Sequence, residues 1–497
     1  MMRQHSDKLA HSIGIGETSV AEIAIGKYIK NNYGIALAEH QQATLVCAIK
    51  KICNKFNYPD ASALYLDMVD NVVTTQVMEL LIDEITVGET YFFRDSKQMA
   101  LLRNKLLPEL IQNKQQQQNK TLRIWSAGCS SGDELYSVAI ILRELIADIS
   151  EWNIHLVGTD INLVLIQQAL AGKYSHHALR KVDNTIASRY FSRSGDSYQL
   201  TSEIMQMAKF SYLNLIDDYY PSFINEINNI DLILCRNVFI YFSEPTIRDV
   251  LNKITQCLTE SGVLMLGASD YWGENISGLE KLVADDVCYF QRGVLTLNDI
   301  IEAINPDKKK YTANTTHSVT GNRLNAEGEQ EIISEVTNED AQIKLDKSDK
   351  LIQVFEQQHS KDSINAIVEA SQQLATAGKV DEAIASCKKA LEIDEMDINC
   401  NYLYGQLLAE KNLTEEAVSV FKKIVYLAPK MPEAHYYLGV LSFRNGNKDR
   451  AIKHMMNTVT LAKQKASDAQ VLNESNMTYS RLAEIVEHEI TIYSEIR

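Results

Sequence analysis

The chain has 497 residues, too many for one hydrophobic core, so we expect two or three domains. The net charge of −16 argues against general nucleic-acid binding. No apolar run approaches the ~18 residues of a membrane-spanning helix, and the amino terminus lacks a signal peptide's apolar core. The eight cysteines form no Cys-x-x-Cys pair and no zinc pattern. We therefore expect a cytoplasmic protein with reduced thiols, not inserted into a membrane and without a metal site.

Residues from about 18 to 85 have apolar positions near helical spacing and predict a helical lobe. Lys50, Lys51 and Lys55 lie in one of these expected helices. Charged residues are mostly exposed in any protein, so these lysines fit a solvated face as well as a binding face.

A glycine loop follows the first expected strand. Residues 122–126 are apolar and end in small residues, as a buried strand does. Gly128 and Gly132 then bracket a tight loop, and Asp133 and Glu134 begin an apolar pattern of helical spacing. Glycine lets a ligand approach the backbone, and N–H groups at the helix start would face that ligand. Alone, this signal leaves a simple turn equally open.

Three further strands are expected at 155–160, 230–235 and 263–267, separated by helical segments. Strands that alternate with helices predict a parallel sheet, with ligands outside the carboxyl ends of the strands. Asp160 ends the second strand, where nucleotide-binding folds use an acidic residue to bind ribose hydroxyls. Its separation from Gly132 exceeds the ~20 residues of a dinucleotide fingerprint, so we expect a different adenosine ligand.

Shorter strand-like segments follow the second expected strand and close the domain. Residues 190–191, 198–200 and 210–213 have strand character, with a turn signal at 192–197. Residues 282–283 and 287–290 predict a closing antiparallel hairpin, so we expect the domain to end near Gly293.

Four motifs resemble the CheR-type chemotaxis receptor methyltransferases. They are ETYFFRD at 89–95, WSAGCSSGDELYS at 125–137, GTDIN at 158–162 and CRNVFIYF at 235–242. Their order and spacing match over roughly the first 295 residues. The resemblance implies S-adenosylmethionine as methyl donor, S-adenosylhomocysteine as product, and a glutamate on the cytoplasmic helices of a chemoreceptor as acceptor. It also implies that 190–213 is a small inserted β-subdomain.

The resemblance also implies the site residues. Arg94 and Tyr241 are the expected catalytic residues: Arg94 at the methionine end of the donor, where a guanidinium can donate two parallel hydrogen bonds to a carboxylate, and Tyr241 near the transferred methyl. No general base is expected. The expected donor-binding residues are Thr90, Arg94, Gly128, Glu134, Asp160, Asn214, Leu215, Arg236 and Asn237.

Some of these residues have a structural alternative, and some positions depart from the family pattern. Glu134 would also stabilise a helix amino terminus, and Asn214 would also cap a turn. Gly88 stands where the family usually has asparagine, and Ala48 stands where a basic residue is expected. Residues 267–270 replace a segment that usually contains histidine.

The last third of the chain is an internal repeat. The 34-residue period predicts tetratricopeptide repeats, which bind peptides or partner proteins. A capping helix is expected at 466–487. The residues that recur at this period are Gly378, Asn412 and Gly446, then Ala383, Ala417 and Ala451, then Asp381, Glu415 and Asp449, and finally Gly405 and Gly439.

We therefore expect a multidomain protein of α/β and α class. Residues 1–87 form the helical lobe, 88–295 a Rossmann-like methyltransferase domain with its β-subdomain near 188–213, 296–360 a flexible linker, and 361–497 the repeat solenoid. A chain ending at Asn305 should then keep donor binding. Two alternatives stay open: a weakly catalytic donor-binding scaffold that acts through its repeats, and a methyltransferase for another protein or a small acid.

Overall fold

The computed structural model describes residues 19–38, 41–70, 72–86, 88–217, 220–222, 226–270, 275–293, 361–376, 379–466, 469–472 and 477–495. It divides into two compact units. One combines Met1–Gly293 with Gly446–Arg497, and the other is Val294–Asn445. The expected linker at 296–360 lies outside the described residues.

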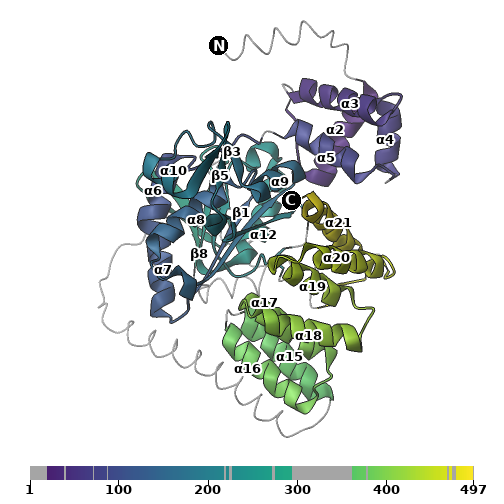
Figure 1. The fold of residues 1–497 in the computed structure, drawn as a ribbon. Coiled ribbons are helices and arrows are strands. Elements are labelled where there is room, and N and C mark those ends of the chain that lie inside the picture. Colours follow the sequence, from purple (N-terminus) through teal and green to yellow (C-terminus); the bar gives the residue numbers. More distant parts are fainter. Residues whose placement is uncertain are drawn as a thin grey trace, which may run out of the picture. The chain divides into compact units, whose positions relative to one another are not determined.

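Among the described residues, the amino-terminal lobe contains four helices: α2 (Val20–Tyr33), α3 (Gln42–Phe56), α4 (Ala61–Val69) and α5 (Thr75–Ile85) (Figure 1). A capping box starts α2, because the Ser19 hydroxyl accepts from the Glu22 N–H while the Glu22 carboxylate accepts from the Ser19 N–H. Their apolar faces share one core, which includes Ile25, Ile29, Leu45, Ile49, Leu64 and Leu81.

The three lysines of α3 are exposed, whereas Ala48 is 1% exposed and packs in the lobe core. A basic residue at that position would therefore have to enter the core. Lys51 forms an ion pair with Glu84 of α5.

After α6 (Ser96–Leu101), η2 (Leu102–Leu106) and α7 (Leu107–Gln116), the chain enters a seven-stranded sheet of order β6-β2-β1-β7-β8-β10-β9. The strands from β6 to β8 are parallel, and β9 and β10 form the expected antiparallel hairpin. The strands are β1 (Thr121–Ala127), β2 (Asn153–Asp160), β6 (Ala208–Tyr212), β7 (Ile230–Cys235), β8 (Leu258–Leu266), β9 (Leu279–Ala284) and β10 (Val287–Arg292).

Helices cover both faces of this sheet. Alternate residues of a strand point to opposite faces, so Ile124 packs in one core and Trp125 in the other. The first core contains α8 (Asp133–Leu145) and α9 (Leu163–Ala171), and the second contains α12 (Glu244–Cys257). The sequence prediction of a Rossmann-like domain is confirmed.

The small β-subdomain differs from its prediction. Its three-stranded sheet has the order β3-β5-β4, where β4 (Phe191–Ser194) and β5 (Ser197–Leu200) form the expected hairpin. The third strand is β3 (Lys173–Ser175), not residues 210–213. Most of that segment belongs to β6, which pairs with β2 at the edge of the large sheet. The short helices α10 (Asn184–Tyr190) and α11 (Ser202–Met205) flank the hairpin, and η3 (Ile149–Glu151) precedes β2.

In the unit Val294–Asn445, the repeat builds paired helices: α15 (Lys361–Thr376), α16 (Val380–Ile393), α17 (Ile398–Glu410), α18 (Thr414–Leu427) and α19 (Pro432–Arg444). Small residues permit close packing of these helices. A Cβ on Gly405 would lie 2.8 Å from the Phe421 ring, and Ala383 and Ala417 are fully buried.

The last two helices are α20 (Lys448–Ala462) and α21 (Tyr479–Glu495), which pack side by side (Figure 1). α20 starts 34 residues after α18 and so keeps the period. The expected capping helix begins later than predicted, at Tyr479 rather than 466. Both helices belong to the compact unit of the methyltransferase domain, whereas the sequence assigned them to the array.

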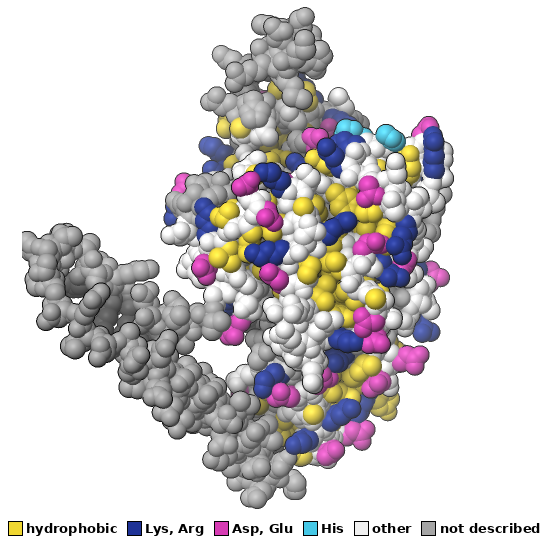
Figure 2. Space-filling model, turned by 90° about the vertical axis from the view of Figure 1, so that its left-hand side faces the viewer, with side chains coloured by type: hydrophobic (Ala, Val, Ile, Leu, Met, Phe, Trp, Pro, Cys, Tyr) yellow, Lys and Arg dark blue, Asp and Glu magenta, His cyan; other side chains and the backbone are white. Residues whose placement is uncertain are grey.

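Within the described residues, no helix is long and apolar enough to cross a membrane, and no group of three His, Cys, Asp or Glu could hold a metal ion. On the face in Figure 2, basic and acidic side chains are interspersed with apolar ones. Although the chain has a net charge of −16, its acidic side chains do not gather in one region on this face.

Candidate active site

A cavity of about 300 Å³ lies where the carboxyl ends of β1, β2 and β7 meet the amino-terminal lobe. The structure brings all the sequence-predicted site residues together around it. Their contacts with a donor remain predictions. The lining residues among them are Thr90, Arg94, Gly128, Glu134, Asp160, Asn214, Leu215, Arg236, Asn237 and Tyr241.

The glycine loop between β1 and α8 is shaped for close backbone approach. Gly128 has φ +74°, and a Cβ there would lie 2.4 Å from Val238 Cγ2. Any other residue would therefore be strained and would clash. The Ser130 N–H donates to Asp160 Oδ2 at 2.8 Å, which ties the loop to the end of β2.

Asp160 is held from two sides, because the Asn162 N–H donates to its Oδ1 at 2.9 Å. Burial raises the pKa of this carboxyl, while the backbone N–H donors oppose that shift. Since its oxygens can accept further hydrogen bonds, a diol at this point of the cavity would find an oriented acceptor.

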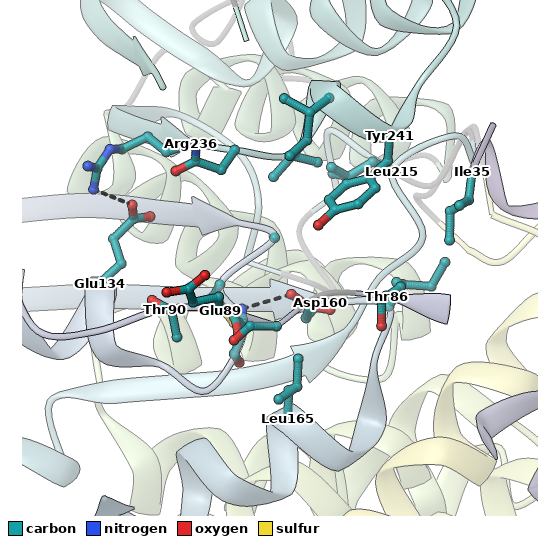
Figure 3. A pocket seen from close by; sticks show the side chains of 18 of the residues that line it. Ile35, Thr86, Glu89, Thr90, Glu134, Asp160, Leu165, Leu215, Arg236 and Tyr241 are labelled. Carbon is teal, nitrogen blue, oxygen red and sulfur yellow. Dashed lines mark hydrogen bonds and ion pairs between the residues drawn. The ribbon is translucent and has the colours of Figure 1, made fainter. Parts of the chain in front are cut away.

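On another side of the cavity, Glu134 and Arg236 form what we call the Glu134 wall (Figure 3). Arg236 Nη1 lies 2.8 Å from Glu134 Oε2, and the two side chains are 2% and 12% exposed. Ser126 Oγ donates to Glu134 Oε1 at 2.7 Å. Arg236 also donates to Gln98 Oε1 at 2.5 Å and to the Arg94 carbonyl at 2.8 Å. Glu134 is thus more than a helix-start residue, because it forms a nearly buried ion pair.

The segment 88–94 passes over the cavity. Arg94 Nη1 donates to the Glu89 carbonyl at 2.5 Å, which curls the segment. Gly88 has no room for a side chain: a Cβ would lie 2.7 Å from Leu165 Cδ1. Leu165, which lines the cavity, fills the space that a family asparagine would need.

Tyr241 belongs to the short 3₁₀ turn η4 (Phe239–Tyr241) and lies across the cavity from Asp160 and Thr86 (Figure 3). Asp270 holds this turn, because its carboxylate accepts from the N–H groups of Asn237, Phe239 and Gly267. Asp270 is 3% exposed, and burial raises its pKa. It lies in the segment where the family usually has histidine, and the sequence analysis did not identify its role.

Cys129 also lines the cavity, but it is a poor candidate nucleophile. The residue is 2% exposed, and burial, then Asp160 and Glu134, raise the pKa of its thiol. At neutral pH the thiol is therefore protonated, and the reactive form of cysteine is the thiolate.

Residues 213–215 form a third side, which we call the Asn214 wall (Leu213, Asn214 and Leu215). The Asn214 side-chain amide donates to the Asn32 carbonyl at 2.8 Å, so the amino-terminal lobe supports this wall. The lobe also contributes Tyr33 and Ile35 to the lining, which the sequence analysis missed. Their only signal was an apolar pattern, which does not distinguish a core from a pocket.

Comparisons with known proteins agree with this geometry. The model "CheR methyltransferase, SAM binding domain" matches residues 88–286, and "Tetratricopeptide repeat" matches residues 398–431. "Chemotaxis protein methyltransferase" from Borreliella burgdorferi is 30% identical over 271 residues, 54% of this chain and 93% of that protein. The chain belongs to the chemotaxis protein methyltransferase family.

Other members of the family have similar values. "Chemotaxis protein methyltransferase 1" from Pseudomonas aeruginosa is 30% identical over 251 residues, 49% of this chain and 87% of that protein. "Chemotaxis protein methyltransferase 2" from Vibrio cholerae is 32% identical over 194 residues, which are 39% of this chain and 65% of that protein. PcrH from P. aeruginosa is similar to 27% of this chain at 16% identity, but its TM-score of 0.24 carries no weight.

The family establishes S-adenosylmethionine-dependent methylation in chemotaxis, and the cavity fits that donor. The backbone of the glycine loop lines the cavity at Gly128, and the Asp160 carboxylate can accept hydrogen bonds from hydroxyl groups. The bound donor supplies an electrophilic methyl group on a sulfonium. The predicted site residues would bind and orient it, and the apolar lining of Ile35, Ile161 and Leu165 would limit water.

Proposed function

We propose that this protein transfers the methyl group to glutamate side chains of a chemoreceptor-like protein and forms glutamyl methyl esters. The observation that supports the proposal is a donor cavity whose lining carboxylates each already have a partner. Glu134 is paired with Arg236, Asp160 accepts two backbone N–H groups, and Glu89, which is 69% exposed, lies 3.7 Å from Arg180. The Cys129 thiol is protonated.

A glutamate acceptor explains why no base is needed. Its carboxyl group has a pKa near ~4.3, so at neutral pH it is already the nucleophile. The enzyme has to align oxygen, methyl and sulfur and exclude water, which contributes on the order of 7–11 kcal/mol in oriented reactions. Arg94 and Thr90 hold the methionine end of the donor, and Tyr241 orients the acceptor carboxylate in this proposal.

The wider organisation follows from the same proposal. The substrate is the cytoplasmic helices of a receptor, so the enzyme works in the cytoplasm. Residues 1–87 assist recognition, 88–295 carry out transfer, and 296–360 connect them to repeats that bind a protein or peptide partner. The match to a tetratricopeptide model supports the last role.

The test is transfer of labelled methyl from S-adenosylmethionine to a cytoplasmic receptor fragment by the full-length chain. Mild base should release the label as methanol, because esters hydrolyse where N-methyl groups do not. Replacing the candidate glutamates by alanine in the fragment should abolish labelling. Label that survives base would overturn the ester, and tight donor binding without transfer to any carboxylate would favour a scaffold.

A further inference from the structure

The carboxy-terminal helix α21 packs against the methyltransferase sheet. It contacts β6, the edge strand beside β2, and α9. The His488 ring stacks on the Tyr212 ring of β6, with centroids 4.4 Å apart and an interplanar angle of 21°. Leu482 and Val486 of α21 are fully buried. The helix is therefore a packed part of this unit.

An ion pair joins α21 to the segment directly after β6. Arg481 Nη2 pairs with Asp217 Oδ2, and the two side chains are 13% and 19% exposed. The Arg481 guanidinium also lies over the Tyr212 ring, 5.8 Å from its centroid. A largely buried carboxylate needs such a partner, because losing one member of a buried pair leaves the other charge desolvated.

Asp217 in turn fixes the cavity lining. Its Oδ1 accepts from Asn214 Nδ2 at 3.2 Å, and its N–H donates to the Asn214 carbonyl at 3.1 Å. Asn214 is 3% exposed and forms the centre of the Asn214 wall. A continuous chain of polar contacts thus runs from Arg481 through Asp217 to the cavity.

The same cluster reaches a second lining residue, Tyr33. Burial raises the pKa of its hydroxyl, and Tyr212 adds to this shift, whereas the Arg481 charge opposes it. The Arg481 charge on α21 therefore acts electrostatically on a residue that lines the cavity, although Arg481 itself does not line it.

We propose that Arg481 is a positioning residue for the donor pocket, which holds the Asn214 wall in place through Asp217. Helix α21 is then a structural part of the donor site, so a chain ending at Asn305, which the sequence analysis expected to keep donor binding, should bind the donor more weakly. This inference rests on donor binding, which the family establishes, and not on the proposed receptor substrate.

The test measures donor-site affinity in the full-length chain without an acceptor. Arg481→Met should weaken S-adenosylhomocysteine binding about five- to tenfold by calorimetry, at a temperature where the variant is folded. Methylthioadenosine, which lacks the amino-acid end, should lose affinity by the same factor.

Matched variants separate positioning from general stability. Glu484 also pairs with Arg481 but is 55% exposed, so Glu484→Gln should leave affinity within twofold. Arg481→Lys, which keeps the charge, should recover most of the affinity. Asp217→Asn should match Arg481→Met, and the double variant should be no weaker than either single one, because both break the same link.

Wild-type affinity in a folded Arg481→Met variant with a lowered melting temperature would overturn the proposal and make the contact merely structural. If Arg481→Met does not fold, the nearly isosteric Asp217→Asn decides: unchanged affinity for both ligands rejects the link. Failure to methylate a receptor would not affect this result, because no acceptor is present.

Discussion

The Glu134 wall and the Asn214 wall of one cavity are held in different ways. The first is an ion pair supported by residues between Arg94 and Arg236, all inside the segment 88–286 that matches the family model. The second is supported from outside that segment, by Asn32 of the lobe and through Asp217 by Arg481 of α21. A family match therefore identifies the residues of a site more completely than it identifies what supports them.

The largest effect is expected from Asp160→Ala, which removes the acceptor between the two walls. Hydrogen bonds to a charged group contribute about 1.5–3 kcal/mol each, so losing two ribose contacts should weaken donor binding at least about 100-fold. Calorimetry with S-adenosylhomocysteine measures this, with the exposed Asp196→Ala as control. Unchanged affinity would remove Asp160 from the site.

Glu134→Gln tests the Glu134 wall and should act on stability as well as on binding. It leaves the nearly buried Arg236 without its carboxylate, which typically costs about 3 kcal/mol or more. The melting temperature should fall by about 5–10 °C. Glu244→Gln breaks an ion pair with Arg248 whose side chains, Glu244 and Arg248, are 62% and 54% exposed. This variant should lower the melting temperature far less. Equal shifts would contradict the importance of the buried pair.

Tyr241→Phe should separate donor binding from transfer. The donor affinity should stay within twofold while the rate falls about tenfold, which is ~1.4 kcal/mol of activation free energy. Tyr198→Phe, in the small sheet, serves as control. Normal turnover in the Tyr241→Phe variant would leave this tyrosine a packing role only.

The smallest expected effect concerns the support behind the Asn214 wall and depends on pH. Burial, and then Arg481, lower the pKa of His488 to about 4 from its usual 6.5, even though Glu79 lies 3.9 Å away. The folded state therefore binds fewer protons than the unfolded state between these values, and stability falls as pH drops below 6.5.

His488→Phe keeps a ring against Tyr212 and removes this titration. From pH 7.5 to 5.5 the wild type should lose about 1 kcal/mol more stability than the variant. Melting temperatures at the two pH values measure the difference. The histidine His155, whose pKa is also lowered to about 4, is present in both proteins and so cancels. Identical pH profiles would show that His488 does not stay neutral on folding.

The sequence predicted the parts of the site whose signals are local. The glycine loop, the acid at the end of β2 and the Arg236-Asn237 pair each lie within a few residues of the strand that positions them. The assignment of residues 210–213 to the β-subdomain failed, because strand character does not reveal the partner: β6 pairs with β2, about 50 residues earlier.

Other features depend on contacts that no local pattern contains. The side chain of Leu165 explains the glycine at position 88, and the carboxylate of Asp270 explains how the turn that contains Tyr241 is held. The sequence analysis did not identify Arg481, because its partner Asp217 lies 264 residues earlier in the chain.

That separation has a consequence for synthesis. Translation at roughly 5–20 residues per second needs about 13–50 seconds to pass from Asp217 to Arg481. During this time β6 and the Tyr212 ring lack the helix that packs on them, and an open strand edge can pair with other chains. The methyltransferase domain therefore completes the packing around β6 only after α21 has been synthesised.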